Sequence, residues 1–175
     1  MLIVALRAAL ITDVARLMRL GDPYVLVRGA SDYWLYGAPF ASTCPVAVAD
    51  GEVVGAVIAM RSQDDPDDVY VQDVMVHPAH RRRGVATMLL GAVTDRARRW
   101  GCRRVYLTSA PDNTTAAAAW RRLGFRNLPG DLIVADVQVV ADFKGPGRDR
   151  AVYQLDVTTA GPAAPSRTED QGDGR

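Results

Sequence analysis

The sequence predicts a single α/β (α+β) domain over residues 1–157, and three observations support this fold class. Strand-like and helix-like patterns alternate along this length, which is enough chain to bury one core. The apolar run 69–76 leads through a basic turn at 81–86 directly into a helical pattern. Asp50-Gly51, between two apolar runs, predicts a β-hairpin.

Periodicity and turn chemistry predict the element order β-α-α-β-β-β-α-β-α-β-β. Thr12 or Asp13 is expected to cap the first helix, and Gly101 and Gly124 are expected to end the last two. Residues 158–175 are rich in Pro, Gly, Ala and Asp, which predicts a disordered C-terminal tail. The expected strands are 2–7, 44–49, 53–60, 69–76, 105–109, 132–143 and 150–157, and the expected helices are 12–20, 31–41, 85–100 and 113–123.

Bulk composition argues against several classes of protein. The net charge of +1 is too balanced for a nucleic-acid-binding surface, and no apolar run reaches membrane-spanning length. The first residues lack the basic region of a signal peptide. Cys44 and Cys102 have no metal-type spacing, so we expect no metal and no disulfide, but two buried thiols in a reducing cytoplasm. Abundant arginine and alanine, with Lys144 as the only lysine, suggest a GC-rich bacterial genome.

A phosphate-binding turn is expected between the strand 69–76 and the helix that follows. In a strand-turn-helix unit the backbone N–H groups point outward, and the helix N-terminus adds roughly half a positive charge. Gly84 lets phosphate approach the backbone without a Cβ in the way, and arginines can hold its oxygens bidentately. The alternative is a solvated basic turn. The residues of this turn are Arg81, Arg82, Arg83, Gly84, Val85 and Ala86.

Two segments resemble the GCN5-related N-acetyltransferase (GNAT) superfamily. Arg81-x-x-Gly84-x-Ala86 satisfies its acyl-CoA signature, and 113–125 resembles its N-x-x-A…Y-x-x-x-G-F segment. The resemblance implies the GNAT fold, a mixed sheet of about six or seven strands, splayed in the middle and flanked by about four helices. It also implies acetyl-CoA as acyl donor, bound in the splayed gap. We expect direct transfer to an amine in a ternary complex, because neither cysteine lies in a recognisable nucleophile setting.

The same resemblance assigns expected contacts to acetyl-CoA. The turn 81–86 would hold the pyrophosphate, while the backbone amides of Met75 and Val76 would hold the pantetheine arm and the acetyl carbonyl. Asn113 is expected to cap its helix and to bond to the pantetheine, and Trp120 to pack beside it.

Asp73 is the expected general base, because many members of the superfamily place a carboxylate on this strand to deprotonate the amine, often through water. The alternative is a carboxylate that is hydrogen-bonded to a loop. Simple alternation puts Asp73 on the face of Val71 and Met75. His77 has a suitable pKa but is expected to be structural, since His-Pro is a common turn at this place in the superfamily.

Trp120 occupies the position where the superfamily usually has a tyrosine general acid. An indole N–H is a hydrogen-bond donor but not a usable acid. A thiolate is a tolerable leaving group, so the acid is dispensable. Ser109 would shuttle a proton or bind the sulfur, and the alternative is a hydroxyl bonded to the backbone.

Acidic and aromatic residues suggest an ammonium-bearing acceptor. Four aspartates lie between residues 64 and 68, and the alternative for them is a solvated loop. Segments 40–47, 70–76 and 111–113 resemble diaminobutyrate acetyltransferases, although their Asn-Ser-rich stretch is not evident near residue 30. Both features indicate a small amino-acid-like or diamine substrate. The expected acceptor contacts are Asp32, Tyr33, Trp34 and Tyr36, with an amphipathic helix as the alternative.

The expected function is therefore N-acetylation of a small-molecule amine with acetyl-CoA. Two alternatives stay open: transfer to a protein or carrier-bound amine that docks on arginines 96, 98 and 99, and a catalytically silent acyl-CoA sensor. Nucleic-acid binding is the least favoured, since the arginines are spread over helices and turns. We expect no membrane partner, and the sequence is compatible with a homodimer.

Overall fold

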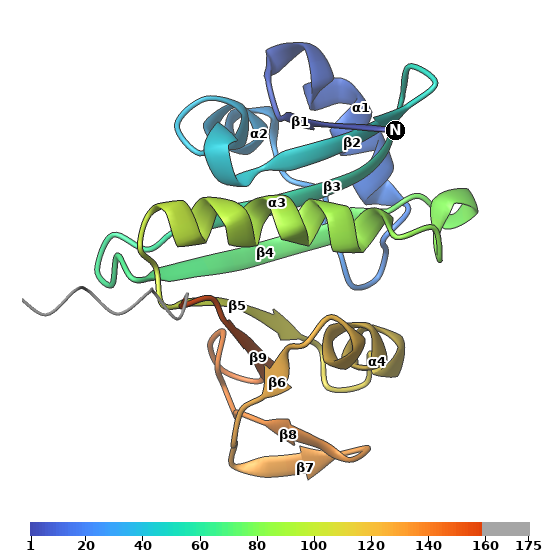
Figure 1. Cartoon of the computed structure of the whole chain (residues 1–175). Helices are drawn as coiled ribbons and strands as arrows, with labels where there is room; N and C mark the ends of the chain where they lie inside the picture. Colours follow the sequence, from blue (N-terminus) through green and yellow to red (C-terminus); the bar gives the residue numbers. More distant parts are fainter. Residues whose placement is uncertain (159–175) are drawn as a thin grey trace, which may run out of the picture.

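The computed structural model describes residues 1–158, and it confirms the predicted class with four helices and a seven-stranded mixed sheet (Figure 1). The strand order is β1-β2-β3-β4-β5-β9-β6, and β7 pairs with β8 in a separate hairpin. The main-sheet strands are β1 (Leu2–Ala5), β2 (Pro45–Ala49), β3 (Glu52–Arg61), β4 (Asp68–Val76), β5 (Arg104–Ser109), β6 (Arg126–Asn127) and β9 (Ala151–Asp156). The helices are α1 (Ile11–Arg19), α2 (Ala30–Gly37), α3 (Val85–Arg99) and α4 (Thr114–Arg122).

The sheet opens between β4 and β5. These two strands are parallel and pair only from Asp68–Arg104 to Val71–Leu107, although β4 continues to Val76. Beyond Val71 the strands diverge, and the molecule forms two halves joined at one end (Figure 1). The predicted splay is therefore present, and it leaves one edge of β4 open.

A β-bulge at Gln72 changes the face of the sheet to which the following side chains of β4 point. Ile58 of β3 pairs with Asp73 and Ala59 pairs with Val71, so Gln72 has no partner in β3. Val71 and Ala59 belong to the core under α3, whereas Ile58 belongs to the core under α1 and α2. Simple alternation, which put Asp73 on the face of Val71, was wrong because the extra residue turns Asp73 to the opposite face.

Each face of the sheet has its own core. Leu89 and Val93 of α3 pack against β2, β3 and β4, and Val14 and Met18 of α1 pack on the other face. Cys44 and Cys102 are buried free thiols, as expected from their isolated positions. In the described part of the chain, no helix has both the length and the hydropathy needed to cross a bilayer.

Two local expectations were wrong. Helix α1 begins at Ile11, since a 3₁₀ turn over Ala8–Leu10 leads straight into it. Thr12 and Asp13 thus lie inside its first turn, and neither caps it. Helix α2 ends at Gly37 instead of residue 41, because residues 38–40 form a turn that leads into a 3₁₀ turn over Ala41–Thr43.

The segment 132–143 is not one strand but the hairpin of β7 (Leu132–Val134) and β8 (Val137–Val139). Ala135 and Asp136 both have positive φ, 47° and 61°, as a two-residue hairpin turn requires. This dipeptide lacks the glycine of Asp50-Gly51, whose predicted hairpin is confirmed, so it gave no turn signal. The short strand β6 was also missed. The expected tail lies outside the described residues from 159 onward.

Candidate active site

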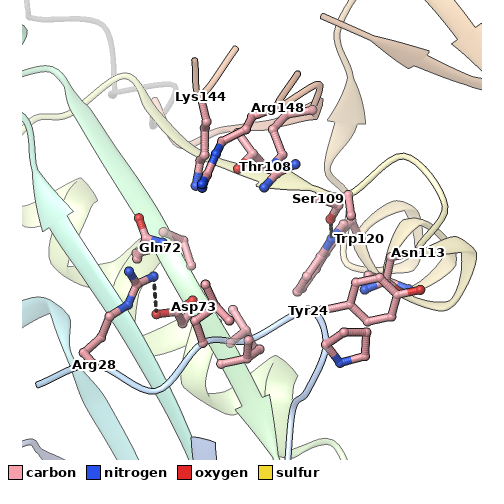
Figure 2. A pocket seen from close by; sticks show the side chains of 18 residues that line it. Tyr24, Arg28, Gln72, Asp73, Thr108, Ser109, Asn113, Trp120, Lys144 and Arg148 are labelled. Carbon is pink, nitrogen blue, oxygen red and sulfur yellow. Dashed lines mark hydrogen bonds and ion pairs between the residues drawn. The ribbon is translucent and has the colours of Figure 1, made fainter. Parts of the chain in front are cut away.

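A cavity of about 280 Å³ lies where β4 and β5 diverge (Figure 2). It is lined by the α1–α2 connection, the bulged part of β4, the end of β5, the first turns of α4, and the loop between β8 and β9. Asp73, Ser109, Asn113 and Trp120, which the sequence analysis singled out separately, all line this cavity. The splay and the Gln72 bulge together bring them to one place.

Asp73 is a buried carboxylate at the cavity wall. Its side chain is 8% exposed, and Oδ2 lies 3.5 Å from Nη2 of Arg28 in the α1–α2 connection (Figure 2). Burial raises the pKa of Asp73, although Arg28 and Lys144 oppose this shift. A carboxylate with a raised pKa is a stronger base than a solvated aspartate. The side chain thus has the chemistry expected of a base and also pairs with a loop, so the two alternatives are not exclusive.

Ser109 and Trp120 are joined by a hydrogen bond on the opposite wall. Trp120 Nε1–H donates to Ser109 Oγ at 2.7 Å (Figure 2). Because the oxygen accepts from the indole, the hydroxyl hydrogen of Ser109 is available for a second partner. The Trp120 ring also packs edge-on against Phe125, with 6.3 Å between the ring centroids. Its indole therefore orients a hydroxyl, a role that the sequence did not reveal.

The basic turn before α3 has an anion-binding geometry. Arg82 and Gly84 have positive φ, 62° and 77°, and Gly84 is the N-cap of α3. The first helical bond runs from Met88 N–H to Gly84 O at 3.0 Å, so the helix itself does not use the amides of Val85 and Ala86. Apart from Gly84 itself and its two chain neighbours, no heavy atom of residues 1–158 lies within 4 Å of where a Gly84 Cβ would stand. The remaining arginines of the turn, Arg81 and Arg83, are exposed.

The open edge of β4 presents alternate amides. His77 N–H donates to Val54 O of β3 at 2.9 Å, and amides alternate sides along an antiparallel ladder. The amide of Met75 therefore faces β3, while those of Val74 and Val76 face the open edge. The predicted use of the Val76 amide by acetyl-CoA is therefore compatible with this ladder. The same prediction for Met75 is not, because its amide faces β3 and not the open edge.

Two local predictions are confirmed. Asn113 caps α4, because its side chain accepts a hydrogen bond from Ala116 N–H at 3.0 Å. His77 has the structural role that was favoured for it, since its Nδ1 accepts from Ala79 N–H at 3.2 Å.

The four expected acceptor contacts do not line the cavity. Tyr33 is 2% exposed within the core under α1 and α2, and Tyr36 packs edge-on against it. Asp32 accepts from Gly29 N–H at 3.0 Å at the start of α2, and Trp34 points to solvent with 57% exposure. The helical period of α2 thus separates residues that are adjacent in the sequence.

The acidic loop also lies elsewhere. Asp68 is bonded to Arg104 Nη2 at 2.5 Å and to Arg103 Nε at 3.3 Å, and Asp65 is bonded to Arg103 Nη2 at 2.6 Å. These pairs tie the closed end of the β4–β5 splay, away from the cavity. Two of the four carboxylates expected to attract an ammonium group are therefore engaged in structural pairs, and none of the four lines the cavity.

Sequence reasoning missed the cavity's cations. Arg28, Lys144, Arg148 and Arg150 all line it, from the α1–α2 connection and the β8–β9 loop. The available signal was a Gly-Pro-Gly turn just before the last strand, with the chain's only lysine directly before it and two arginines after it.

The Acetyltransferase (GNAT) family model matches residues 15–125. The chain belongs to this family. It is a family of acetyltransferases, and the match covers the splayed region, the basic turn and α4 of this chain.

Relatives and solved structures agree with this assignment. The chain is 35% identical over 123 residues to the L-2,4-diaminobutyric acid acetyltransferase of Nocardia farcinica, covering 69% of this chain and 64% of that protein, which is less than two thirds of its length. It is 31% identical to the Streptomyces coelicolor enzyme of the same name, over 86% of this chain and 91% of that one. A solved diaminobutyrate acetyltransferase from Paenibacillus lautus, complexed with its substrate and coenzyme A, has a TM-score of 0.69 at 22% identity, with 89% and 93% of the two chains covered. The latter likeness shows the fold alone.

Proposed function

We propose that residues 1–157 form a catalytic domain that transfers the acetyl group of acetyl-CoA to the primary amine of a small amino-acid-like molecule. The observation that carries this proposal is the pairing across one cavity of a buried carboxylate, Asp73, with an oriented hydroxyl, Ser109 (Figure 2). The volume of about 280 Å³ suits a small acceptor better than a protein side chain with its flanking backbone. Diaminobutyric acid, named for the relatives, is an acceptor of this size.

In the proposed reaction the amine nitrogen attacks the thioester carbonyl carbon, and the carbon–sulfur bond breaks. Asp73 takes the proton of the attacking amine, directly or through a water molecule. The Ser109 hydroxyl, oriented by Trp120, donates a hydrogen bond to the departing thiolate, which then takes up a proton. The turn 81–86 holds the donor's phosphates, and the open-edge amide of Val76 holds its pantetheine arm.

Direct transfer is supported by the state of the two cysteines. Burial raises the pKa of the Cys44 thiol to about 12, and it also raises that of Cys102. A thiol in this environment is a poor nucleophile, because the reactive species is the thiolate. We therefore invoke no acyl-enzyme intermediate. The two free thiols also support a reducing compartment such as the cytoplasm. A single chain builds the cavity, so the proposal holds for a monomer and for a homodimer.

The test is release of the coenzyme A thiol when the protein is mixed with acetyl-CoA and a panel of small amines, carrier-bound amines and peptides. We expect turnover with small amines that carry a carboxylate. Turnover only with peptides or carrier-bound amines would contradict the small-molecule assignment. Absence of turnover with tight acetyl-CoA binding would instead favour an acyl-CoA sensor.

Gly84→Asp tests the phosphate turn. The substitution puts a Cβ and a negative charge where phosphate would approach, so we expect it to abolish thermal protection by acetyl-CoA. In the wild type, ligand at a hundred times its Kd adds about 2.7 kcal/mol of stability. Gly51→Asp is the matched control, since Gly51 has a similar φ of 83° and equally open surroundings on a remote hairpin. Equal protection of both variants would contradict the assignment.

A further inference from the structure

The β8–β9 loop is held in one shape by its own hydrogen bonds. Val140 and Arg150 exchange two backbone bonds of 2.8 and 3.0 Å, which close the loop at its base. Inside it, Asp142 Oδ1 accepts from Gly147 N–H at 2.6 Å, and Asp149 Oδ1 accepts from Asp142 N–H at 2.9 Å. The two carboxylates of the loop are therefore used to fix its backbone.

This loop directs its cations into the cavity. Figure 2 shows the side chains of Lys144 and Arg148 entering from the side opposite Asp73. Lys144 is half-buried, and its Nζ lies 5.3 Å from the centre of the Tyr70 ring. It also acts on the far wall, because its charge lowers the pKa of Asp73 against the larger effect of burial.

The cavity carries more positive than negative charge. Four cations line it, and Asp73 is the one carboxylate among its lining residues in the described chain. Within residues 1–158, Arg28 is the only one of the four cations with a carboxylate oxygen within 4.0 Å. Its Nε is also buried and has no hydrogen-bond partner in that range. The cations of the loop thus face the acceptor space without carboxylate partners in the described chain.

We propose, resting on the function proposed above, that the acceptor is an acidic amine whose carboxylate is bound by Lys144 and Arg148. A guanidinium binds a carboxylate through paired hydrogen bonds, and a nearby ammonium adds attraction. A second ammonium group on the acceptor would meet the same cations and be repelled. The site therefore selects amino acids with an additional carboxylate and discriminates against diamines, the opposite of what the acidic stretches of the sequence suggested.

Four-carbon acceptors test this selectivity, because they differ in charge at similar size: aspartate, 2-aminobutyrate, 2,4-diaminobutyrate and 1,4-diaminobutane. We expect kcat/KM to fall in that order. Lys144→Met and Arg148→Met should each lower kcat/KM for aspartate about tenfold to a hundredfold, the usual range for loss of a charged hydrogen bond. The value for 1,4-diaminobutane, which has no carboxylate, should instead rise, because a repelling positive charge is removed. Arg16→Met, on an exposed face of α1, is the control and should change none of them.

Two kinetic outcomes would overturn the proposal. One is a preference for diamines in the wild type. The other is an equal loss of activity with every acceptor in the two loop variants, which would indicate a structural role for the loop.

The single lysine allows a test that does not need turnover. An amine-selective reagent can modify only Lys144 and the chain's N-terminal amine, so the latter serves as an internal reference. We expect succinate, a dicarboxylate without an amine, to slow modification of Lys144 relative to that reference and to chloride at equal ionic strength. If no amine is acetylated but succinate protects Lys144, the proposed function fails while the anion site stands. Absence of protection overturns the site itself.

Discussion

Two buried aspartates on the same strand differ in their hydrogen-bond partners, and these partners decide whether the carboxylate stabilises the fold or can act as a base. Asp68 is the first residue of β4 and Asp73 lies five residues further along it, and their side chains are 5% and 8% exposed. Burial raises the pKa of both, but for Asp68 the bonds from Arg104 and Arg103 outweigh it, and the net pKa is lowered. For Asp73 the single 3.5 Å contact with Arg28 does not outweigh burial, and the pKa is raised.

The comparison teaches that burial alone does not identify a reactive carboxylate. Asp68 lies where β4 and β5 are paired, so strand neighbours supply two guanidinium groups. Asp73 lies beyond the point where the strands diverge, so one side of it faces the cavity. Ionisation of Asp68 stabilises the fold, and ionisation of Asp73 costs folding free energy but leaves a base beside the acceptor.

The largest expected effect is that of Asp73→Asn. We expect kcat at neutral pH to fall roughly a hundredfold or more, because the amine loses its proton acceptor, while acetyl-CoA still binds. The free energy of unfolding at neutral pH should not fall, since the ionised Asp73 is a cost to the fold. Steady-state kinetics with calorimetric acetyl-CoA binding and urea unfolding measure all three. A wild-type rate in the variant would move the role of base to another group.

Asp68→Asn should have the reverse profile. It leaves Arg104, 28% exposed, without its carboxylate, so we expect the free energy of unfolding at pH 7 to fall by about 2 kcal/mol. Because the folded pKa of Asp68 is lowered, the stabilisation is present at neutral pH and is lost as the pH falls through that pKa. Urea unfolding at neutral and acidic pH should therefore show a difference that shrinks in acid. A large loss of kcat at unchanged stability would contradict the structural assignment.

Arg28→Met tests whether Asp73 is the group whose titration controls the rate. Arg28 lowers the pKa of Asp73, so its removal should raise that pKa further. The acid limb of kcat/KM is then expected to move to higher pH, with the rate on the plateau changed less than in Asp73→Asn. Arg16→Met controls for loss of an arginine and should not move the limb. A shift to lower pH would show that the ion pair does not act on the titrating group.

The smallest effect is expected at Trp120. Trp120→Phe keeps an aromatic wall but removes the donor to Ser109, so we expect the rate to change by less than about tenfold, below the range for loss of an acid or base. Trp120→Tyr should give no large gain, because departure of a thiolate is not limiting. A gain of about a hundredfold with Trp120→Tyr would instead describe a protein that has lost its general acid.

Much of this fold was predictable, since the Asp50-Gly51 hairpin, the splay and the basic turn each depend on local residues or on a recognisable motif. The facing of Asp73 was not, because the bulge at Gln72 is set by pairing with β3 and has no glycine to mark it. The cations of the β8–β9 loop that line the cavity were also not predictable. Lys144 lies about seventy residues from Asp73 in the sequence, and only the closed β8–β9 loop brings it to the cavity. Aspartates next to aromatic residues were misleading, because ion pairs and helical geometry place them elsewhere.

The most direct test of the central claim is the pH dependence of kcat/KM for the wild type and Asp73→Asn with the same acceptor and saturating acetyl-CoA. For the wild type we expect an acid limb at a pH above the ordinary aspartate pKa, because burial raises the pKa of Asp73. The variant should lack this limb and gain rate only as the amine itself loses its proton, so the two curves should converge at high pH. Parallel curves across the whole range would contradict the claim that Asp73 is the base.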